Sequence, residues 1–137
     1  MTGGPPENFA SLLRARRGYL ATLGAEGFPH VLPVCFTWAG DTVWTAIDGK
    51  RKAGSPLQRL ADVQPNSKVS FMVDRWDEDW TRLAWLQARG KARQISKGPE
   101  AEKAIEALKS KYSQYSDTTL EGPVLSIEVE RWLSWEA

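Results

Sequence analysis

Short runs of alternating apolar and polar residues dominate the chain, and turns containing Gly, Pro or Asn separate them. Alternation with a period of two is typical of strands that bury one face. The clearest run is Lys68 to Asp74, in which Val69, Phe71 and Val73 fall on one side. The pattern predicts six strands, at residues 19–23, 29–38, 42–47, 68–74, 82–95 and 123–132.

Two residues inside these runs predict irregularities. Pro33 has no N–H to donate, so the second strand should lie at an edge of the sheet, carry a bulge or be split there. Gly90 interrupts the long fifth strand and indicates a bend or a bulge. On that strand we expect Leu83, Trp85, Gln87 and Arg89 on one face, with the residues between them on the other.

Helical patterns occur in three places. The runs that begin at Glu7 and at Pro99 repeat their apolar residues with the period of an α-helix. The stretch 55–62 opens with a capping-box pattern and a proline in its first turn, which is typical of a short helix. Six antiparallel strands with two or three peripheral helices favour a small closed barrel, because closure removes the exposed edges of a sheet.

The composition is that of one mainly β (α+β) domain over residues 1–137, with residues 1–6 expected to be poorly ordered. A net charge of +1 argues against a dedicated nucleic-acid binder. No apolar stretch approaches the ~20 residues of a membrane span, and no signal-peptide pattern begins the chain. One cysteine and one histidine exclude an internal disulfide and leave little for a zinc site. We therefore expect a cytoplasmic protein without a bound metal.

Three consecutive cations, Lys50, Arg51 and Lys52, follow the third predicted strand and precede the capped helix. Backbone N–H groups at a helix start and nearby cations both favour an anion such as a phosphate. A solvated basic turn is the alternative. Seven tryptophans are unusual for a chain of 137 residues, and they indicate a large aromatic core, a protein interface or a planar ligand.

The order of these elements resembles the pyridoxamine-phosphate-oxidase-like proteins with an FMN-binding split barrel, and most closely their deazaflavin (F420)-dependent branch. The resemblance implies a six-stranded antiparallel split β-barrel with two or three peripheral helices. It runs from about residue 8 to residue 135, and the stretches that carry it are Arg17–Leu23, Gly27–Phe36, Lys50–Lys52, Asn66–Ser70, Asp77–Trp80, Gly90–Arg93 and Glu130–Trp132.

The resemblance also implies a homodimer with a cofactor site at each side of the subunit interface. The strand after the turn would lie along the cofactor ring, through His30, Val31, Leu32, Pro33 and Val34. The following strand and loop would hold the ribityl-phosphate arm through Thr45, Lys50, Arg51 and Lys52. The partner subunit would close the site with Trp85, Gln87, Trp132 and Trp135.

The chain departs from the pyridoxamine-phosphate oxidases themselves at two places. His30 stands where those enzymes have an arginine, and Arg131-Trp132-Leu133 replaces their Arg-x-His substrate-phosphate motif. Pyridoxamine phosphate is therefore not the expected substrate. His30 either supplies a proton to a product or to the ring, or fills a hydrogen-bonding position at a strand start.

Three functions follow from the resemblance. The first is an oxidoreductase that transfers a hydride from reduced F420 to an unidentified small organic molecule. The second is an FMN-dependent oxidase or reductase of the same fold, and the third is a carrier that binds the cofactor without turnover. The sequence has no triad or paired-carboxylate motif, so no catalytic side chain is assigned.

Overall fold

The chain folds around one antiparallel sheet of seven strands, in the order β2-β1-β5-β6-β7-β4-β3. The structure is a computed structural model, and it describes residues 3–46, 62–117, 120 and 123–137. The strands are β1 (Gly18–Leu23), β2 (Pro29–Val34), β3 (Thr37–Ala39), β4 (Thr42–Ala46), β5 (Lys68–Arg75), β6 (Ala84–Ile95) and β7 (Val124–Glu136). The helical segments are the 3₁₀ helices η1 (Glu7–Arg14), η2 (Trp80–Arg82) and η3 (Ser113–Asp117) and the α-helix α2 (Pro99–Lys111).

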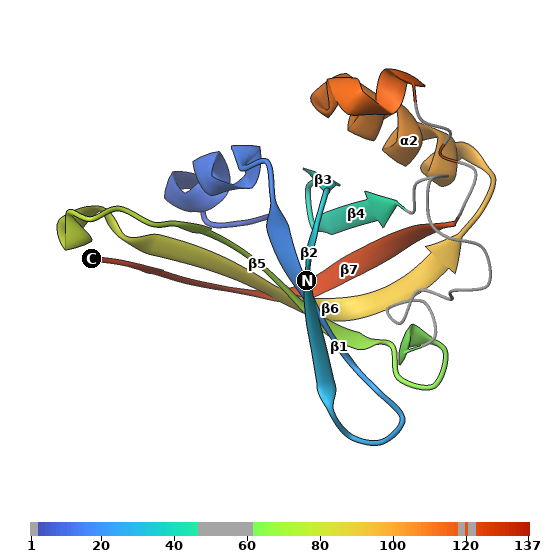
Figure 1. Cartoon of the computed structure of the whole chain (residues 1–137), viewed down its shortest axis with the longest axis horizontal. Helices are drawn as coiled ribbons and strands as arrows, with labels where there is room; N and C mark the ends of the chain where they lie inside the picture. The colour runs from blue at the N-terminus through green and yellow to red at the C-terminus, as the bar shows by residue number, and fades with distance from the viewer. Residues whose placement is uncertain (1–2, 47–61, 118–119, 121–122) are drawn as a thin grey trace.

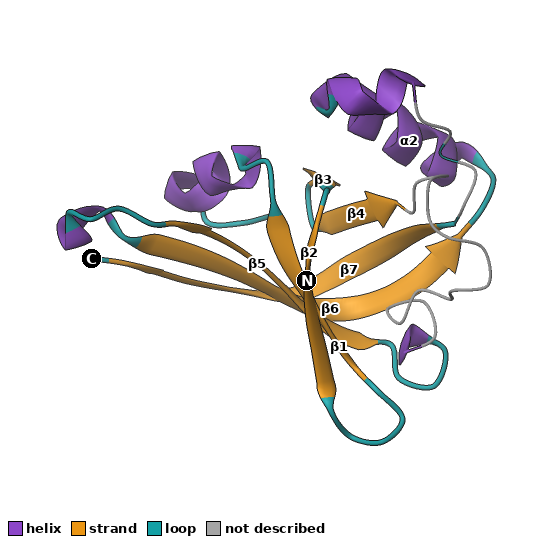
Figure 2. Cartoon of the chain, in the orientation of Figure 1, coloured by secondary structure: helices purple, strands orange, loops and turns teal. Residues whose placement is uncertain are grey.

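Figure 1 shows β5, β6 and β7 extending together to one side, where the connection from β5 to β6 lies beside the C-terminal end. The β1–β2 hairpin projects in another direction, and α2 lies beyond β4 (Figure 1). The helical segments surround the sheet rather than interrupting it (Figure 2). None of the helices in the described ranges is long and apolar enough to span a membrane.

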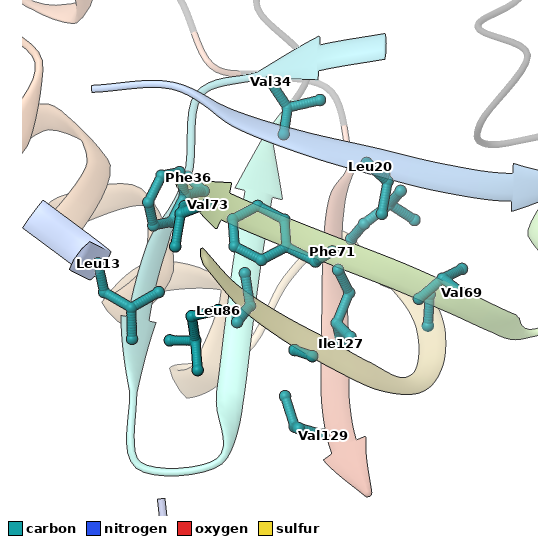
Figure 3. Close-up of a cluster of buried hydrophobic side chains, with 14 of the residues drawn as sticks. Leu13, Leu20, Val34, Phe36, Val69, Phe71, Val73, Leu86, Ile127 and Val129 are labelled. Atoms are coloured by element: carbon teal, nitrogen blue, oxygen red, sulfur yellow. The ribbon is translucent and has the colours of Figure 1, made fainter. Parts of the chain in front are cut away.

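A core of apolar side chains fills the inner face of the curled sheet. Phe36 and Phe71 meet edge to face with ring centroids 4.8 Å apart, among aliphatic side chains from η1 and from six strands. Figure 3 labels several of these side chains. A second cluster lies beneath α2, where Leu108 and Tyr112 pack against Trp44 and Val124. The strand pattern of the sequence is confirmed here, because Val69, Phe71 and Val73 are all buried.

The predicted strand over residues 29–38 is wrong in one respect: it forms two strands, so the sheet has seven strands and not six. The chain leaves the ladder at Cys35 and Phe36 because α2 satisfies the backbone of Phe36. The Phe36 N–H donates to the Tyr112 hydroxyl at 3.1 Å, and its C=O accepts from Lys111 Nζ at 3.0 Å. Phe36 can therefore point its ring into the core without an adjacent strand.

The mainly β split-barrel architecture is confirmed, but the described strands do not close into the barrel that their pattern favoured. In the part of the chain that the structure describes, the sheet ends at β2 and at β3, and no ladder joins them. The sheet is a curled half-barrel, as in a split barrel. Pro33 lies on β2, at an edge of the sheet as its missing N–H required. The segment from Glu7 is a 3₁₀ helix, and the predicted helix at 55–62 lies outside the described residues except at Asp62.

The bulge predicted at Gly90 is confirmed. The pairing of β6 with β7 shifts between Arg89 and Gly90, so that Arg89 faces Arg131 and Gly90 faces Val129. Glu130 is the extra residue of β7. A Cβ atom at Gly90 would overlap the backbone carbonyl of Glu128, which leaves no room for any other residue.

Candidate functional site

The predicted ring-binding residues of β2 divide between the two faces of the sheet. Val31 and Pro33 pair with Ala21 and Tyr19 on the outer face, whereas the alternate residues of β2 face the core side. Val31 is 65% exposed. His30 and Leu32 are partly buried on the inner side, and Val34 is buried in the core.

The predicted partner residues of β6 and β7 also divide between the faces. Trp85 lies opposite Trp135 and Gln87 opposite Leu133 on the outer face. Trp132 lies opposite Ala88, packs against the core and donates from Nε1 to Asp41 Oδ1 at 2.9 Å. A hollow of 190 Å³ adjoins this region, and Trp76, Trp85 and Trp135 all line it.

In one chain, the described residues of β2 and of β6 that were predicted to bind the cofactor do not lie together. β1 and β5 lie between β2 and β6 in the sheet. At about 4.8 Å per strand, Val31 and Pro33 are therefore roughly 14 Å from Gln87 on the same face. Lys50, Arg51 and Lys52 lie outside the described residues.

Thr45 is the buried polar residue of β4 that lacks a partner. Thr45 is 2% exposed, and its Oγ1 makes no hydrogen bond within the part of the chain that the structure describes. A buried hydroxyl without a partner costs roughly 1–3 kcal/mol. Thr45 is the penultimate residue of β4, five positions before the first of the three cations in the sequence. A polar ligand atom at this position would satisfy it, and this fits the predicted contact with a cofactor arm.

His30 is bound to a buried carboxylate. Its Nδ1 lies 2.6 Å from Asp62 Oδ2, and Thr22 Oγ1 donates to the same oxygen at 2.5 Å. Asp62 and Thr22 are each 2% exposed. Since a carboxylate only accepts, the proton of this bond belongs to His30 Nδ1. The second nitrogen, Nε2, lies 3.9 Å from Glu26 Oε1 at the β1–β2 turn.

This arrangement fixes the orientation of the His30 ring and leaves Nε2 at the more open side. It is compatible with both interpretations of His30, a proton donor and a structural hydrogen-bonding residue. Sequence reasoning missed Asp62, which lies 32 positions away in the chain. No local spacing signals such a pair.

A second polar network, on the outer side of the sheet, was also missed. Glu100 in the first turn of α2 accepts from Trp44 Nε1 at 2.9 Å, from Ser126 Oγ at 2.5 Å and from Arg93 at 2.5 Å. The hydrogen bond from Ser126, followed by those from Trp44 and Arg93, lowers the pKa of Glu100 below its ordinary value. Through these hydrogen bonds, α2 is connected to β4, β6 and β7.

A larger hollow of 420 Å³ lies on the outer face of β1, β5 and β6. Ala21, Ser70 and Arg89 are among the residues that line it. Among the described residues, none that is predicted to bind the cofactor lines this hollow. The described residues contain no group of three His, Cys, Asp or Glu side chains that could hold a metal ion.

Comparison with known proteins identifies the family of the chain. Residues 5–136 match the family model described as pyridoxamine 5'-phosphate oxidase. No curated protein matches the sequence.

Several solved structures share the fold. A conserved hypothetical protein of Mycobacterium tuberculosis superposes with a TM-score of 0.76 at 18% identity, over 99% of this chain and 85% of that one. A FAD-binding protein of Mesorhizobium loti gives 0.70 at 18% identity, over 96% and 93% of the two chains. A protein named F420 reductase gives 0.65 at 22% identity, over 93% and 98%. At these identities the likeness establishes the fold alone.

Proposed function

Because the chain belongs to the pyridoxamine 5'-phosphate oxidase family, we propose that it is an oxidoreductase that binds F420 and reduces a small organic substrate. The family match over residues 5–136 is the observation that carries the proposal. The fold shared with a protein named F420 reductase favours the deazaflavin. FMN is the alternative cofactor, favoured by the fold shared with a FAD-binding protein.

The bound cofactor would supply the hydride, so the chain needs only to bind, orient and shield it. The edge strand β2 supports this role, because one side of its backbone is not paired with another strand of the described sheet. His30, Val31, Leu32, Pro33 and Val34 are the residues proposed to lie along the ring. The orphan hydroxyl of Thr45 supports a polar ligand contact at the end of β4.

The wide separation of β2 from β6 supports a homodimer with composite sites. Trp85, Gln87, Trp132 and Trp135 of one subunit would complete the site built on β2 and Thr45 of the other. Mixing two defective variants tests this. Lys52→Ala and Gln87→Ala chains should each bind poorly, whereas their mixed dimer should regain one intact site of the two. Mixtures that bind no better than the separate variants would contradict the composite site.

Titration with each cofactor tests the assignment of the cofactor. The purified protein should bind F420 more tightly than FMN, as followed by the absorbance and fluorescence of each cofactor. Replacing Lys50 or Lys52 by alanine should weaken binding by ~1–3 kcal/mol, the scale of a charge-assisted hydrogen bond. Lys97→Ala, at an exposed lysine, is the matched control. Unchanged affinity after replacement of residues 50–52 by alanine would make this turn plain surface charge.

Thr45→Val separates a ligand contact from a packing role. Since its Oγ1 has no partner, the near-isosteric valine should stabilise the protein without cofactor by about 1 kcal/mol. The same variant should bind the cofactor less tightly. A variant that is more stable but binds equally well would remove Thr45 from the site.

Turnover distinguishes an enzyme from a carrier. Reduced F420 should be oxidised in the presence of at least one substrate from a panel of unsaturated lactones, quinones and tetrapyrroles. Tight binding of F420 without turnover on the whole panel would favour a carrier.

A further inference from the structure

The two ring nitrogens of His30, the only histidine of the chain, have different surroundings. Nδ1 lies 2.6 Å from Oδ2 of Asp62, a carboxylate whose side chain is 2% exposed. Nε2 has no hydrogen bond within the described part of the chain, because Oε1 of Glu26, at 3.9 Å, is beyond hydrogen-bond distance. The side chain of His30 is 29% exposed. One nitrogen is therefore held inside the protein, and the other is open to a bound molecule.

Asp62 is held in place from a second side. The hydroxyl of Thr22, which is also buried, donates to the same Oδ2 atom at 2.5 Å. Taking a carboxylate out of water costs stability, and a buried ion pair often recovers no more than apolar residues of the same size would. A fold that needed only packing at this position would have no use for the carboxylate. The effect of Asp62 on His30 is the better explanation of its burial.

The backbone of the β1–β2 turn fixes the orientation of the His30 ring. A Cβ atom at Gly24 would lie 2.6 Å from Cε1 of His30, so the edge of the ring packs against a position that has no side chain. Between Gly24 and Asp62, the ring turns Nδ1 toward the buried carboxylate and Nε2 toward Glu26 at the turn. A carboxylate only accepts hydrogen bonds, so it holds a proton on Nδ1 in both protonation states of the ring. Only the proton on Nε2 then comes and goes.

We propose that Asp62 is a positioning residue, which keeps one proton on Nδ1 of His30 so that Nε2 can deliver another to the substrate. This inference rests on the proposed function, because reduction by a hydride creates the need for a proton. It also defines the substrate class as molecules with a polarised C=C or C=O bond. Such a substrate would place the atom to be protonated at Nε2, at the turn end of β2.

The proton transfer balances as follows. Addition of a hydride to one atom of the double bond leaves an electron pair on the other atom. This pair takes the proton of Nε2, so an N–H bond breaks and a C–H or O–H bond forms. The ring becomes neutral and keeps its Nδ1 proton on Asp62. Water then returns a proton to Nε2.

Nitrogen NMR of the full chain without cofactor tests the position of the proton. Because His30 is the only histidine, isotope-labelled histidine gives one signal for each ring nitrogen. When the ring is neutral, the wild type should carry its proton on Nδ1. In Asp62→Asn, the amide can turn its own N–H group toward Nδ1, and the proton should move to Nε2. A wild-type proton on Nε2, or a tautomer that Asp62→Asn leaves unchanged, would overturn the proposal.

Oxidation of reduced F420, with a panel substrate that the wild type reduces, tests the use of the proton. Asp62→Asn and His30→Gln should each lower kcat by a factor of ~100 or more, with little change in the affinity for F420. The double variant should be no slower than His30→Gln alone, because both residues act on one proton. Glu106→Gln, at an exposed carboxylate of α2, is the control. A full kcat in Asp62→Asn would overturn the proposal.

Failure of the proposed function gives a different result. A wild type that binds neither F420 nor FMN, or reduces nothing on the panel, would contradict the proposed function and the proton transfer together. The NMR measurement would still decide whether Asp62 holds the proton on Nδ1. Circular dichroism verifies that the variants are folded, and the NMR measurement on the wild type needs no variant.

Discussion

Arg93 and Arg89 lie on the same face of the same strand, four positions apart, in opposite surroundings. Arg93 lies beside the first turn of α2 and, although its side chain is 60% exposed, donates to Glu100, which also binds Trp44 and Ser126. Arg89 is uncovered in the described structure and faces Arg131. On the outer face of β6, the half around Arg93 therefore belongs to a hydrogen-bonded network. In the half around Arg89, two like charges face each other.

The comparison shows that charged residues stabilise the fold in one half of this face and oppose its stability in the other. The α2-covered half satisfies its polar groups within the chain. The other half keeps Arg89 and Arg131 side by side, at a cost in stability. Gly90 and the bulge of β7 lie between the two halves and set the register that brings Arg131 opposite Arg89.

Removing the bulge should give the largest effect. Gly90→Ala places a Cβ against the Glu128 carbonyl, and backbone atoms cannot move aside as a flexible side chain can. We expect the free energy of unfolding in urea to fall by about 3 kcal/mol or more. Gly3→Ala is the control, because a Cβ there meets nothing within 4 Å. A Gly90→Ala protein as stable as the wild type would show that the bulge adapts.

Disrupting the covered half should have the next largest effect. Glu100→Gln removes the charge that accepts from Arg93, Trp44 and Ser126, and should cost about 1–3 kcal/mol at neutral pH. The folded pKa of Glu100 is below the ordinary 4.5, so its contribution is complete above that value and is lost as the pH falls through the folded pKa. Urea unfolding between pH 6 and 3 should show the two proteins converging. Glu102→Gln, on the same helix, should change little.

The half-buried cation Lys111 at the end of α2 should respond to alkaline pH. Burial, with a smaller effect of Arg16, lowers the pKa of Lys111 to about 8 from 10.5. Between these values the unfolded chain binds more protons than the folded one, so stability rises with pH. Relative to Lys111→Met, the wild type should gain about 1 kcal/mol from pH 7.5 to 10 after allowance for screening. Lys109→Met should follow the wild type, and a constant difference would refute the shift.

Replacing either arginine of β6 by glutamine should give the smallest effects on stability, and the two effects should have opposite signs. Arg93→Gln should destabilise the protein by up to about 0.5 kcal/mol, because an ion pair to Glu100 is lost. Arg89→Gln should stabilise it by about 0.2–1 kcal/mol, because a like-charge pair is removed. Urea unfolding at low salt measures both changes. If both variants changed the free energy of unfolding in the same direction, the proposed difference between the two halves would be wrong.

The sequence predicted the features that depend on neighbouring residues. The alternation around Phe71, the edge position of Pro33 and the bulge at Gly90 follow from side-chain period, a missing N–H and a missing Cβ. The break at Phe36 could not be predicted, because its backbone partner Tyr112 lies 76 positions away. The pairs His30–Asp62 and Trp44–Glu100 span 32 and 56 positions, and only the folded sheet brings them together.

For the candidate site, the sequence predicted the fold correctly but not how the proposed residues are placed on it. It did not separate the two faces of β2, so Val31 and Leu32 were predicted to contact one ring although they point to opposite sides. It also gave no sign of Arg89 and Arg131 as a pair, because their apposition depends on the bulge. Whether these residues bind a cofactor stays a prediction.

The hydrogen bond from the Phe36 amide to the Tyr112 hydroxyl makes one proton a reporter of helix docking. Amide protons inside a ladder exchange with solvent only when strands separate. This proton is held by a side chain of the segment that follows α2, so undocking of that helix alone would release it. In native-state hydrogen exchange, the Phe36 amide should therefore open with the α2 amides and at a lower free energy than the amides of β5 and β6.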